Sequence, residues 1–280
     1  MERGLYIVPT PIGNLGDITH RALETLAAVT LIAAEDTRHS KRLLTHYGIE
    51  TPLCAYHDHS SDTATQQLLA RMASGDSVAL ISDAGTPLVS DPGFRLVRAA
   101  QDSGIRVFPL PGPCAAVTAL SGAGLPTDRF FFEGFLPAKA TARRHRLESL
   151  GHQAGTLVIY EAPHRIAATL GDAVAILGEG REAVLARELS KSFETIRRGT
   201  LGELLAWVTE DVNQQRGEQV LLLGPVGDTV DSAVLSAKDR ALLFSLAEEL
   251  PPRKAAAIVA DLSGLRTRDL YKMLTERDKN

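Results

Sequence analysis

The sequence predicts an α/β protein with two αβ domains followed by a small helical domain. Short apolar runs with strand character alternate with amphipathic helical segments through most of the 280 residues. This alternation is typical of βα units and of largely parallel sheets. From Leu235 onward only helical patterns occur, so a small helical extension is expected at the C-terminus.

The composition is typical of a globular protein without a membrane span. Hydrophobic residues make up 44% of the chain and aromatic residues 5%, a balance that favours helices packed on sheets over an all-β fold. No apolar stretch approaches the roughly 20 residues that a helix needs to cross a bilayer, and the N-terminus lacks the pattern of a signal peptide. Cys54 and Cys114 support neither a disulfide framework nor a cysteine-based zinc site. We therefore expect a soluble, cytoplasmic protein.

The net charge of −4 argues against a protein that coats nucleic acid by charge alone. Two local basic clusters nevertheless occur. The first contains Lys139, Arg143, Arg144, His145 and Arg146, and the second contains Arg253, Lys254, Arg266, Arg268 and Lys272. Each cluster is either a solvated helix face or a contact with nucleic acid.

The first αβ domain is assigned to residues 1–120. Its apolar runs predict strands at 5–8, 29–34, 77–82 and 105–110. Its amphipathic segments predict helices at 18–29, 63–75 and 92–104. The segment 121–128, which contains Gly and Pro, is predicted to be a linker.

The second αβ domain is assigned to residues 129–228. Strands are predicted at 129–135, 156–161, 183–188, 195–200 and 219–224, and helices at 163–178 and 201–212. The helical domain is assigned to residues 235–280. Its helical patterns flank a short turn that contains Gly264, which is compatible with a helix-turn-helix.

Ligands of open αβ sheets bind beyond the carboxyl ends of the strands, so the loops after the strands are the first candidates for a site. The loop 9–17 is neither a G-x-G-x-x-G fingerprint nor a phosphate-binding P-loop. This counts against ATP hydrolysis and against a nicotinamide-dependent oxidoreductase. After the second predicted strand come Glu35, Asp36, Arg38, His39 and Lys41. They form either a structural ion-pair network or a site for a polar ligand, and their density favours the ligand.

Two further loops of the first domain combine backbone flexibility with hydrogen-bonding groups. Asp83, Gly85 and Thr86 follow the third predicted strand and supply an acceptor, a close backbone approach and a hydroxyl. Cys114 and Ala115 open a helix of small residues, whose backbone N–H groups can meet a carboxylate or phosphate. A site lined by backbone and one carboxylate suits a zwitterionic or cationic small molecule.

Polar side chains also follow two strands of the second domain. They are Tyr160, Glu161, His164 and Arg165 after one strand, and Arg187, Glu188, Lys191 and Glu194 after the other. His57 and His59 would share a face of an extended segment. No third ligand stands at a suitable spacing, so no metal site is expected.

Blocks throughout the chain resemble the tetrapyrrole-methylase superfamily of S-adenosylmethionine (SAM) enzymes, and within it the group that methylates RNA of the small ribosomal subunit. These blocks are LYIVPTPIGNLGDIT, LIAAEDTRHS, SDAGTPLVSDPG, PLPGPCAAVTALSGAGLPTDRF, EGFLPAK, ARELSKSFETI and GELLAWV. Chance agreement over so many blocks is negligible. The C-terminal helices also resemble the helical extension of that group.

The resemblance implies the two-domain fold of class III SAM methyltransferases, a homodimer, and SAM as cofactor. It implies 2′-O-methylation of a cytidine ribose in the decoding centre of 16S rRNA, in the 30S subunit. The residues matching cofactor contacts are Asp83, Ala84, Gly85, Thr86, Cys114 and Ala115, with further matches at Pro9, Tyr160, Ala186 and Glu218. The loop 13–17 departs from the superfamily's glycine motif, so its Asn14 is assigned to the substrate.

Methyl transfer to a ribose hydroxyl requires alignment of the reacting atoms and invites a general base. The candidate bases, which the sequence does not rank, are Asp36, His57, Glu133, Glu161 and Glu188. The candidates for contact with the RNA substrate are Arg38, Lys139, Arg143, Arg144, His164, Arg165 and Lys191.

Two alternatives to an RNA methyltransferase stay open. A superfamily member that methylates a tetrapyrrole or a protein side chain would not need the helical tail or the basic clusters. A non-enzymatic RNA-binding protein would not need an intact SAM cleft.

Overall fold

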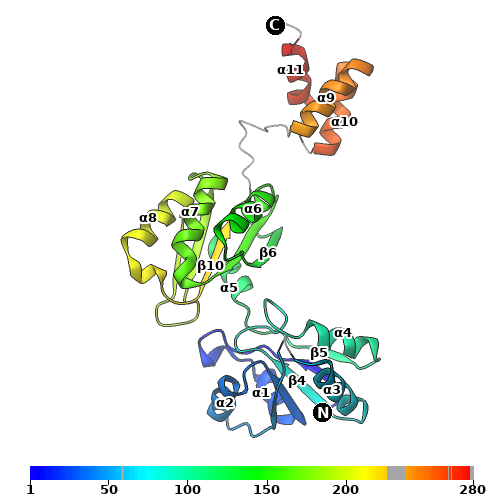
Figure 1. Ribbon diagram of the computed structural model, residues 1–280, viewed down its shortest axis with the longest axis vertical. Helices are drawn as coiled ribbons and strands as arrows, with labels where there is room; N and C mark the ends of the chain where they lie inside the picture. Colours follow the sequence, from blue (N-terminus) through cyan, green and yellow to red (C-terminus); the bar gives the residue numbers. More distant parts are fainter. Residues whose placement is uncertain (58–59, 226–236, 264, 266, 278–280) are drawn as a thin grey trace. The chain divides into compact units, whose positions relative to one another are not determined.

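The computed structural model describes residues 1–57, 60–225, 237–263, 265 and 267–277 (Figure 1). The chain divides into two compact units, Met1–Val226 and Gly227–Asn280. The first unit holds two five-stranded sheets, and the described part of the second is helical. No described helix has the length and apolar character that crossing a membrane demands.

The first sheet is fully parallel. Its strands are β1 (Gly4–Ile7), β2 (Leu31–Ala34), β3 (Leu53–Ala55), β4 (Ser77–Ile81) and β5 (Val107–Pro109), in the order β3-β2-β4-β1-β5. Its helices are α1 (His20–Ala28), α2 (Thr37–His46), α3 (Asp62–Ala73) and α4 (Phe94–Asp102), with a 3₁₀ turn, η1, at Leu15–Asp17. The predicted strands of the first domain are thus confirmed to within two residues at each end.

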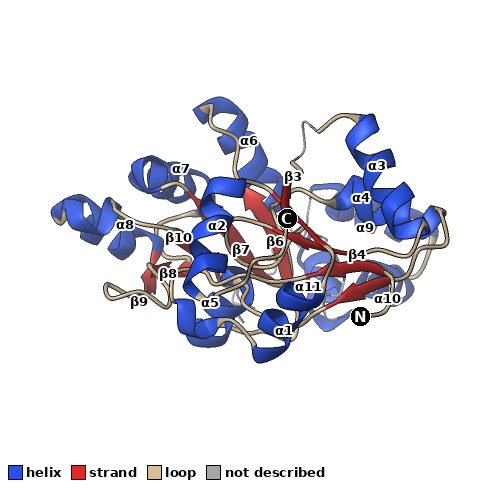
Figure 2. Ribbon diagram, turned by 90° about the horizontal axis from the view of Figure 1, so that it is seen from below, coloured by secondary structure: helices blue, strands red, loops and turns tan. Residues whose placement is uncertain are grey.

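Helices cover both faces of the first sheet, as Figure 2 shows with strands in red and helices in blue. Side chains alternate between the faces of a strand. Leu5 and Ile7 of β1 pack in a cluster with α3 and α4, whereas Tyr6 and Val8 pack in a cluster with α1 and α2. Burial on both faces explains why these strands appear as uninterrupted apolar runs.

The second sheet is mixed, so the prediction of largely parallel sheets is wrong for it. Its strands are β6 (Phe130–Phe135), β7 (Thr156–Glu161), β8 (Glu182–Arg187), β9 (Thr195–Thr200) and β10 (Gln219–Leu223), in the order β6-β7-β10-β8-β9. Only β6 and β7 pair in parallel. The connection between β8 and β9 is too short for a helical crossover, which forces an antiparallel pair.

Four helices cover the second sheet. On one face lie α6 (Ala140–Leu150), α7 (Ile166–Leu177) and α8 (Leu201–Glu210), accompanied by the 3₁₀ turns η2 (Pro163–Arg165) and η3 (Val212–Gln215). On the other face lies α5 (Ala115–Ala123), through Ala116, Ala119 and Leu120. Because α5 follows β5 directly, it joins the first sheet to the second.

Three local expectations need correction or stay open. The predicted linker 121–128 begins inside α5, so its first three residues are helical. The sequence missed α2, because only Ser40 and Leu44 of that charged helix are buried, and β3, because three residues are too few to show alternation. The division of the first unit into two domains stays a prediction.

The second unit contains α9 (Ala237–Glu249), α10 (Pro252–Ser263) and α11 (Thr267–Arg277). The three helices share a small core that includes Leu243, Ala255, Val259 and Leu270. The helical character expected of this segment is therefore present in its described residues.

Candidate active site

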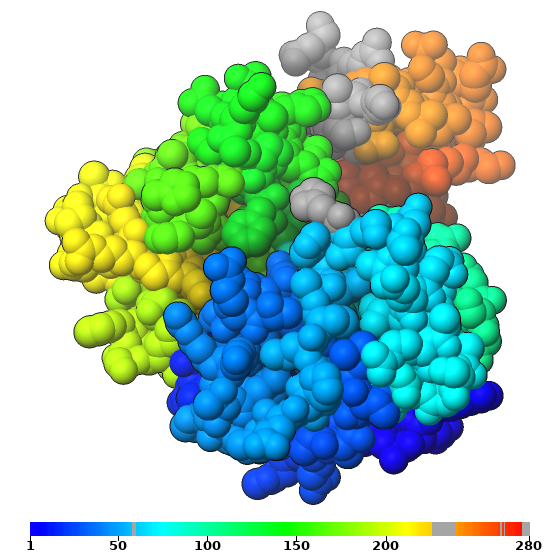
Figure 3. Space-filling view, turned by 60° about the horizontal axis from the view of Figure 1, so that its bottom comes forward, coloured from blue at the N-terminus to red at the C-terminus, as the bar shows by residue number. Residues whose placement is uncertain are grey.

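The carboxyl ends of strands from both sheets border one cavity. In the second sheet, β7 and β8 run in the same direction and β10 runs against them. The start of β10 therefore lies at the same edge as the ends of β7 and β8. In Figure 3 residues near the N-terminus, in blue, lie beside residues from the part of the chain that contains the second sheet, in green and yellow.

The cavity has a volume of about 430 Å³. Nine of the ten residues matched to cofactor contacts line it: Asp83, Ala84, Gly85, Thr86, Cys114, Ala115, Tyr160, Ala186 and Glu218. Pro9 does not line it and lies beside Gly112, where an added Cβ would come within 2.6 Å of the Pro9 Cβ. Ile12, Leu189 and Val220 add apolar walls that the sequence analysis missed. Ile12 could have been suspected from the sequence, because it is an apolar residue in the polar loop 9–17.

The loop after β4 is tied to the loops after β1 and β5. The backbone N–H of Thr10 donates to Gly85 O at 2.9 Å, and that of Gly85 donates to Thr10 O at 3.0 Å. Gly85 adopts φ +82°, a conformation that favours glycine. The Thr86 hydroxyl donates to Pro113 O at 2.8 Å. The turn-forming residues after β4 thus hold three loops together at the mouth of the cavity.

Strained backbone conformations occur in two loops at the cavity. Leu88 and Ser90 after β4, and Glu188 and Ser190 after β8, all have positive φ values between 49° and 74°. Non-glycine residues in this region cost of order 1–3 kcal/mol each and are found mainly at functional sites. This strain supports the assignment of the cavity as the active site.

Carboxylates give the cavity a negative character. Asp83 accepts a hydrogen bond from the backbone N–H of Asp36 at 3.1 Å, so its side chain is oriented. Glu35 and Glu161 also line the cavity, and Glu218 stands at its rim with a 71% exposed side chain. A cation bound here would face these carboxylates.

Tyr160 joins the second sheet to the start of α5. Its hydroxyl oxygen accepts a hydrogen bond from the backbone N–H of Ala116 at 3.0 Å. Its ring contacts Phe132 and Phe135 edge-on, with centroids 4.9 and 5.7 Å apart. Burial, together with the nearby Cys114, raises the pKa of Tyr160 far above its ordinary value, so the phenol stays neutral.

Lys191 reaches from the loop after β8 to the loop after β1. A Cβ added at Gly13 would lie 2.4 Å from the Lys191 Cε, so only glycine leaves room for this side chain. Its ammonium group pairs with Glu188 at 2.9 Å and with Glu218 at 3.2 Å. Burial lowers the pKa of Lys191, but hydrogen bonds with Glu188 and Glu218 outweigh burial and raise it. Lys191 therefore remains a cation at neutral pH.

Four of the five candidate bases do not line the cavity. Asp36 caps α2 by accepting the Arg38 N–H at 2.8 Å, and this hydrogen bond lowers its pKa. Glu133 forms a two-pronged ion pair with Arg146 at 2.6 and 2.7 Å. Glu188 binds Lys191 and the Glu218 N–H. His57 is exposed, and its backbone N–H donates to the Ser60 hydroxyl at 2.8 Å.

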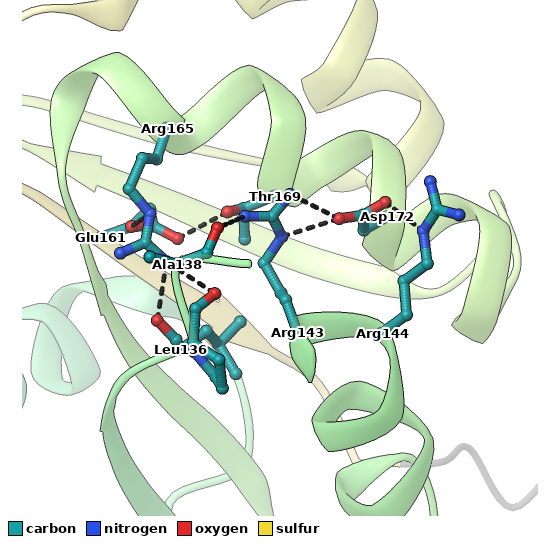
Figure 4. A network of polar contacts seen from close by, with 9 residues as sticks. Leu136, Ala138, Arg143, Arg144, Glu161, Arg165, Thr169 and Asp172 are labelled. Carbon is teal, nitrogen blue, oxygen red and sulfur yellow. Dashed lines mark hydrogen bonds and ion pairs between the residues drawn. The ribbon is translucent and has the colours of Figure 1, made fainter. Parts of the chain in front are cut away.

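Glu161, the fifth candidate, is the one that lines the cavity, but its carboxylate is already engaged (Figure 4). It accepts the Thr169 hydroxyl at 2.5 Å and the Ala162 N–H at 2.8 Å, and it pairs with Arg165 at 3.1 Å. Arg165 in turn donates to Leu136 O at 2.7 Å. The predicted substrate residue Arg165 therefore ties the cavity wall to the loop after β6.

The first predicted basic cluster is largely neutralised within the protein. Arg143 and Arg144 both bind Asp172, at 2.6 Å each (Figure 4). Arg143 is only 5% exposed, and this burial contradicts its assignment to substrate contact. The other two pairs of the cluster are Arg146 with Glu133 and His145 with Glu148. The sequence could not show this, because Asp172 lies on another helix.

The remaining predicted substrate residues are dispersed. Asn14 caps η1 by accepting the Gly16 N–H at 3.0 Å. Lys139 precedes α6 and is exposed, as are Arg38 and His164. His59 and Arg266 lie outside the described residues. Within the described residues, no three His, Cys, Asp or Glu side chains are grouped so that they could hold a metal ion.

A groove of about 360 Å³ adjoins the cavity. The residues that line both are Ile12, Asp83, Ala84 and Glu218. His39 and Arg42 of α2 line the groove, and Lys191 also lies along it. This groove therefore provides space for a second ligand beside the cavity.

The cavity fits SAM in size and chemistry. Its volume lies within the range of about 300–1,000 Å³ that is usual for small-molecule sites. Its carboxylates suit a sulfonium and an ammonium group, and its apolar walls suit an adenine ring. The backbone N–H groups at the start of α5 suit a carboxylate, since helix N-termini attract anions.

Comparison with known proteins agrees with the fold. The family model of the tetrapyrrole (corrin/porphyrin) methylases matches residues 4–205, and that of the RsmI C-terminal HTH domain matches residues 233–278. The uroporphyrin-III C-methyl transferase of Thermus thermophilus, solved in complex with S-adenyl homocysteine, shares the fold with a TM-score of 0.54. It is 18% identical and covers 79% of this chain and 97% of its own.

Curated relatives are much more similar in sequence. The chain is 54% identical over 273 residues to the ribosomal RNA small subunit methyltransferase I of Escherichia coli O157:H7, covering 98% of this chain and 95% of that protein. It is also 54% identical over 273 residues to the protein of the same name from Pseudomonas aeruginosa, covering 98% and 97%. The chain belongs to the ribosomal RNA small subunit methyltransferase I family of the tetrapyrrole methylases, and is thus a SAM-dependent methyltransferase.

Proposed function

We propose that the protein methylates the 2′-oxygen of a cytidine ribose in the decoding centre of 16S rRNA, within the 30S subunit. The observation that carries this proposal is the cavity, which brings together nine residues matched to SAM contacts from five separated stretches of the chain. The relatives at 54% identity are named for the RNA of the small ribosomal subunit. The adjoining groove provides room for a nucleotide beside the cofactor.

The residues of the cavity divide the work of holding the cofactor. Asp83 would face the positive end of the methionine moiety, and Ala84, Gly85 and Thr86 would hold it through their backbone. Cys114 and Ala115 present backbone N–H groups at the start of α5. Tyr160, Ala186 and Glu218 complete the wall contributed by the second sheet.

When bound, SAM supplies a methyl group that is already activated by its positive sulfur. The protein has to align the ribose oxygen at about 3–3.5 Å from that carbon and exclude water. Glu133, Glu161 and Glu188 are held in ion pairs, so we assign them to positioning rather than to proton abstraction. Lys191 holds Glu218 and Glu188 at the junction of cavity and groove.

We further propose that the protein acts as a homodimer in the cytoplasm, where its ribosomal substrate is found. The edge strand β6 supports a dimer because three of its aromatic side chains are open to solvent. Phe130, Phe131 and Phe135 are 51%, 38% and 55% exposed. Exposed aromatic side chains on an edge strand are typical of a protein interface.

Tritiated SAM tests the reaction directly. The purified protein is incubated with 30S subunits from cells that lack the enzyme, with naked 16S RNA and with a tetrapyrrole. We expect label on one decoding-centre ribose in the subunit. Label on the tetrapyrrole alone would keep the cofactor site and overturn the RNA assignment.

A further inference from the structure

Helix α2 carries a cationic surface that is not neutralised within the protein. Arg38, Lys41 and Arg42 are exposed, and Arg38 is 94% exposed at its side chain. The helix itself, Thr37–His46, contains no acidic residue. The spacing of three and four residues places the cations on one side of the helix. The surface defined by Arg38, Lys41 and Arg42 is called the α2 cationic surface below.

The neighbours of these cations do not balance their charge. Arg38 lies 3.8 Å from the capping Asp36, at the long end of an ion pair. For Lys41 and Arg42, no carboxylate among the described residues comes within ion-pair distance. By contrast, the arginines of the predicted basic cluster on α6 are bound to Asp172 and Glu133. The free positive charge therefore lies on α2 rather than on α6.

The α2 cationic surface stands between two grooves. Arg42 lines the groove that adjoins the cofactor cavity. Arg38 and Lys41 line a second groove, of about 720 Å³, between α2 and the edge strand β3. Among the described residues that line this second groove, Glu50 is the one carboxylate. A polyanion lying along this side of α2 would thus contact cations that border both grooves.

The start of α2 is anchored to the cofactor loop. The backbone N–H of Asp36, the residue that caps α2, donates to Asp83 at 3.1 Å. Because Asp83 lines the cavity, this hydrogen bond holds the start of the helix beside it. A ligand bound on α2 would therefore be placed in register with the reacting centre.

We infer that the α2 cationic surface binds the phosphate backbone of the RNA that flanks the target nucleotide. This inference rests on the proposed function and adds to it a substrate-binding surface. Cationic side chains that contact phosphates fix the register of a nucleic acid without reading its bases. The carboxylates of the cavity face the cationic cofactor, and the cations of α2 face the anionic backbone. The negative cavity and the positive helix surface are thus adjacent, since Arg42 lines the groove that adjoins the cavity.

The test removes two positive charges from α2 and, as a control, two from α4. The double variant Lys41→Gln/Arg42→Gln is compared with Arg95→Gln/Arg98→Gln on α4, where both arginines are exposed and paired with Asp62 and Asp102. Both variants change the net charge equally. Binding to unmethylated 30S subunits is measured at several salt concentrations, and SAM binding is measured by calorimetry.

For the α2 variant we expect at least about tenfold weaker binding to the subunit and a salt-dependence slope smaller by about 1–2. SAM affinity should be unchanged, and KM for the subunit should rise more than kcat falls. The α4 variant should match the wild type. Arg42→Lys should retain most of the binding, because the charge is kept.

The outcomes separate this inference from the proposed function. If the wild type methylates the subunit but the α2 variant binds with the same affinity and slope, this inference is overturned and the function stands. An equal loss in the α4 variant would also overturn it, because any lost charge would then suffice. If the wild type transfers no methyl group to 16S rRNA, the proposed function fails and this inference falls with it.

Discussion

The hydroxyl oxygen of Tyr160 lies 3.0 Å from the backbone nitrogen of Ala116 and accepts its hydrogen bond. Tyr160 belongs to β7 of the second sheet, and Ala116 belongs to the first turn of α5, which follows the first sheet. This hydrogen bond thus links the two halves of the cavity, beside the packing of α5 on the second sheet. It also satisfies a backbone N–H that the helix itself cannot satisfy.

Replacing Tyr160 by Phe removes this acceptor and leaves the ring in place. We expect the free energy of unfolding to fall by about 1–3 kcal/mol, because the Ala116 N–H loses its partner in a partly buried site. SAM affinity should fall as well, since α5 begins at the cavity. Thermal or urea unfolding and calorimetry measure the two effects. Tyr271→Phe, at an exposed position on α11, is the control and should change neither.

Replacing Asp83 by Asn keeps an oxygen for the Asp36 N–H and removes the charge. Because a hydrogen bond to a charged group contributes about 1.5–3 kcal/mol, we expect SAM to bind at least about tenfold more weakly. Methylation should fall accordingly. Asp102→Asn, which removes an exposed carboxylate from α4, should bind SAM like the wild type. Unchanged calorimetric affinity in Asp83→Asn would contradict the assignment of this carboxylate.

The pair between Arg143 and Asp172 predicts a specific pH dependence of stability. Burial raises the pKa of Asp172, but hydrogen bonds from Arg144 and Arg143 outweigh burial and hold it below the ordinary value of 3.8. A lowered pKa in the folded state means that the stabilisation is complete above the unfolded-state pKa. It is lost as the pH falls through the folded-state pKa.

Asp172→Asn should therefore cost about 3–5 kcal/mol at pH 7, because Arg143 is left buried without a counter-charge. The difference from the wild type should stay constant from pH 7 to about pH 5 and shrink only below about pH 4. Denaturant unfolding across this range measures it. In the exposed pair of Arg71 and Asp76, Asp76→Asn should cost at most about 1 kcal/mol. Equal costs in both variants would show that burial of the pair is unimportant.

Gly217→Ala tests the packing behind Glu188. Gly217 has φ +77°, and an added Cβ would lie 2.3 Å from the Glu188 Oε1. Gly48 has φ +65° with nothing within 4 Å of an added Cβ, so Gly48→Ala reports backbone strain alone, about 1–2 kcal/mol. We expect Gly217→Ala to cost more than Gly48→Ala and to weaken SAM binding by displacing Glu188. Similar unfolding free energies for both would mean that the loop yields without cost.

Removal of residues 235–280 tests the role of the helical unit. The first unit has its own cores around both sheets, so we expect SAM binding to persist after the truncation. Binding to the 30S subunit should weaken, since the lost segment carries five basic residues of the second cluster. Affinity for the subunit and for SAM are measured in parallel. Equal affinity of the full and truncated chains for the subunit would exclude a role in substrate binding.

The local pattern of apolar and polar residues was sufficient to predict much of the fold. The strands β1, β4 and β7 are apolar runs bounded by polar residues, so the α/β class and the loops that follow them were predictable. The direction of β10 was not, because an apolar strand buried on both faces has the same pattern in either direction. That direction is what brings Glu218 to the cavity.

In the candidate site, too, some features were predictable from the sequence and others depended on packing. The resemblance of short blocks identified nine residues that line one cavity, because cofactor contacts lie in contiguous loops after strands. The basic cluster 139–146 was misleading, because its counter-charge, Asp172, is brought to it only by the packing of α7 against α6.

The sequence by itself determined the fold class, the SAM family and the loops that line the cavity, since each depends on residues that are close together in the chain. Only the tertiary structure decided which charges are free. Arg143 is neutralised by Asp172 from another helix, whereas Lys41 and Arg42 on α2 have no carboxylate of the described residues within ion-pair distance. Ion pairs form between residues that folding brings within a few ångströms, and distance in space is the quantity that a linear sequence does not contain.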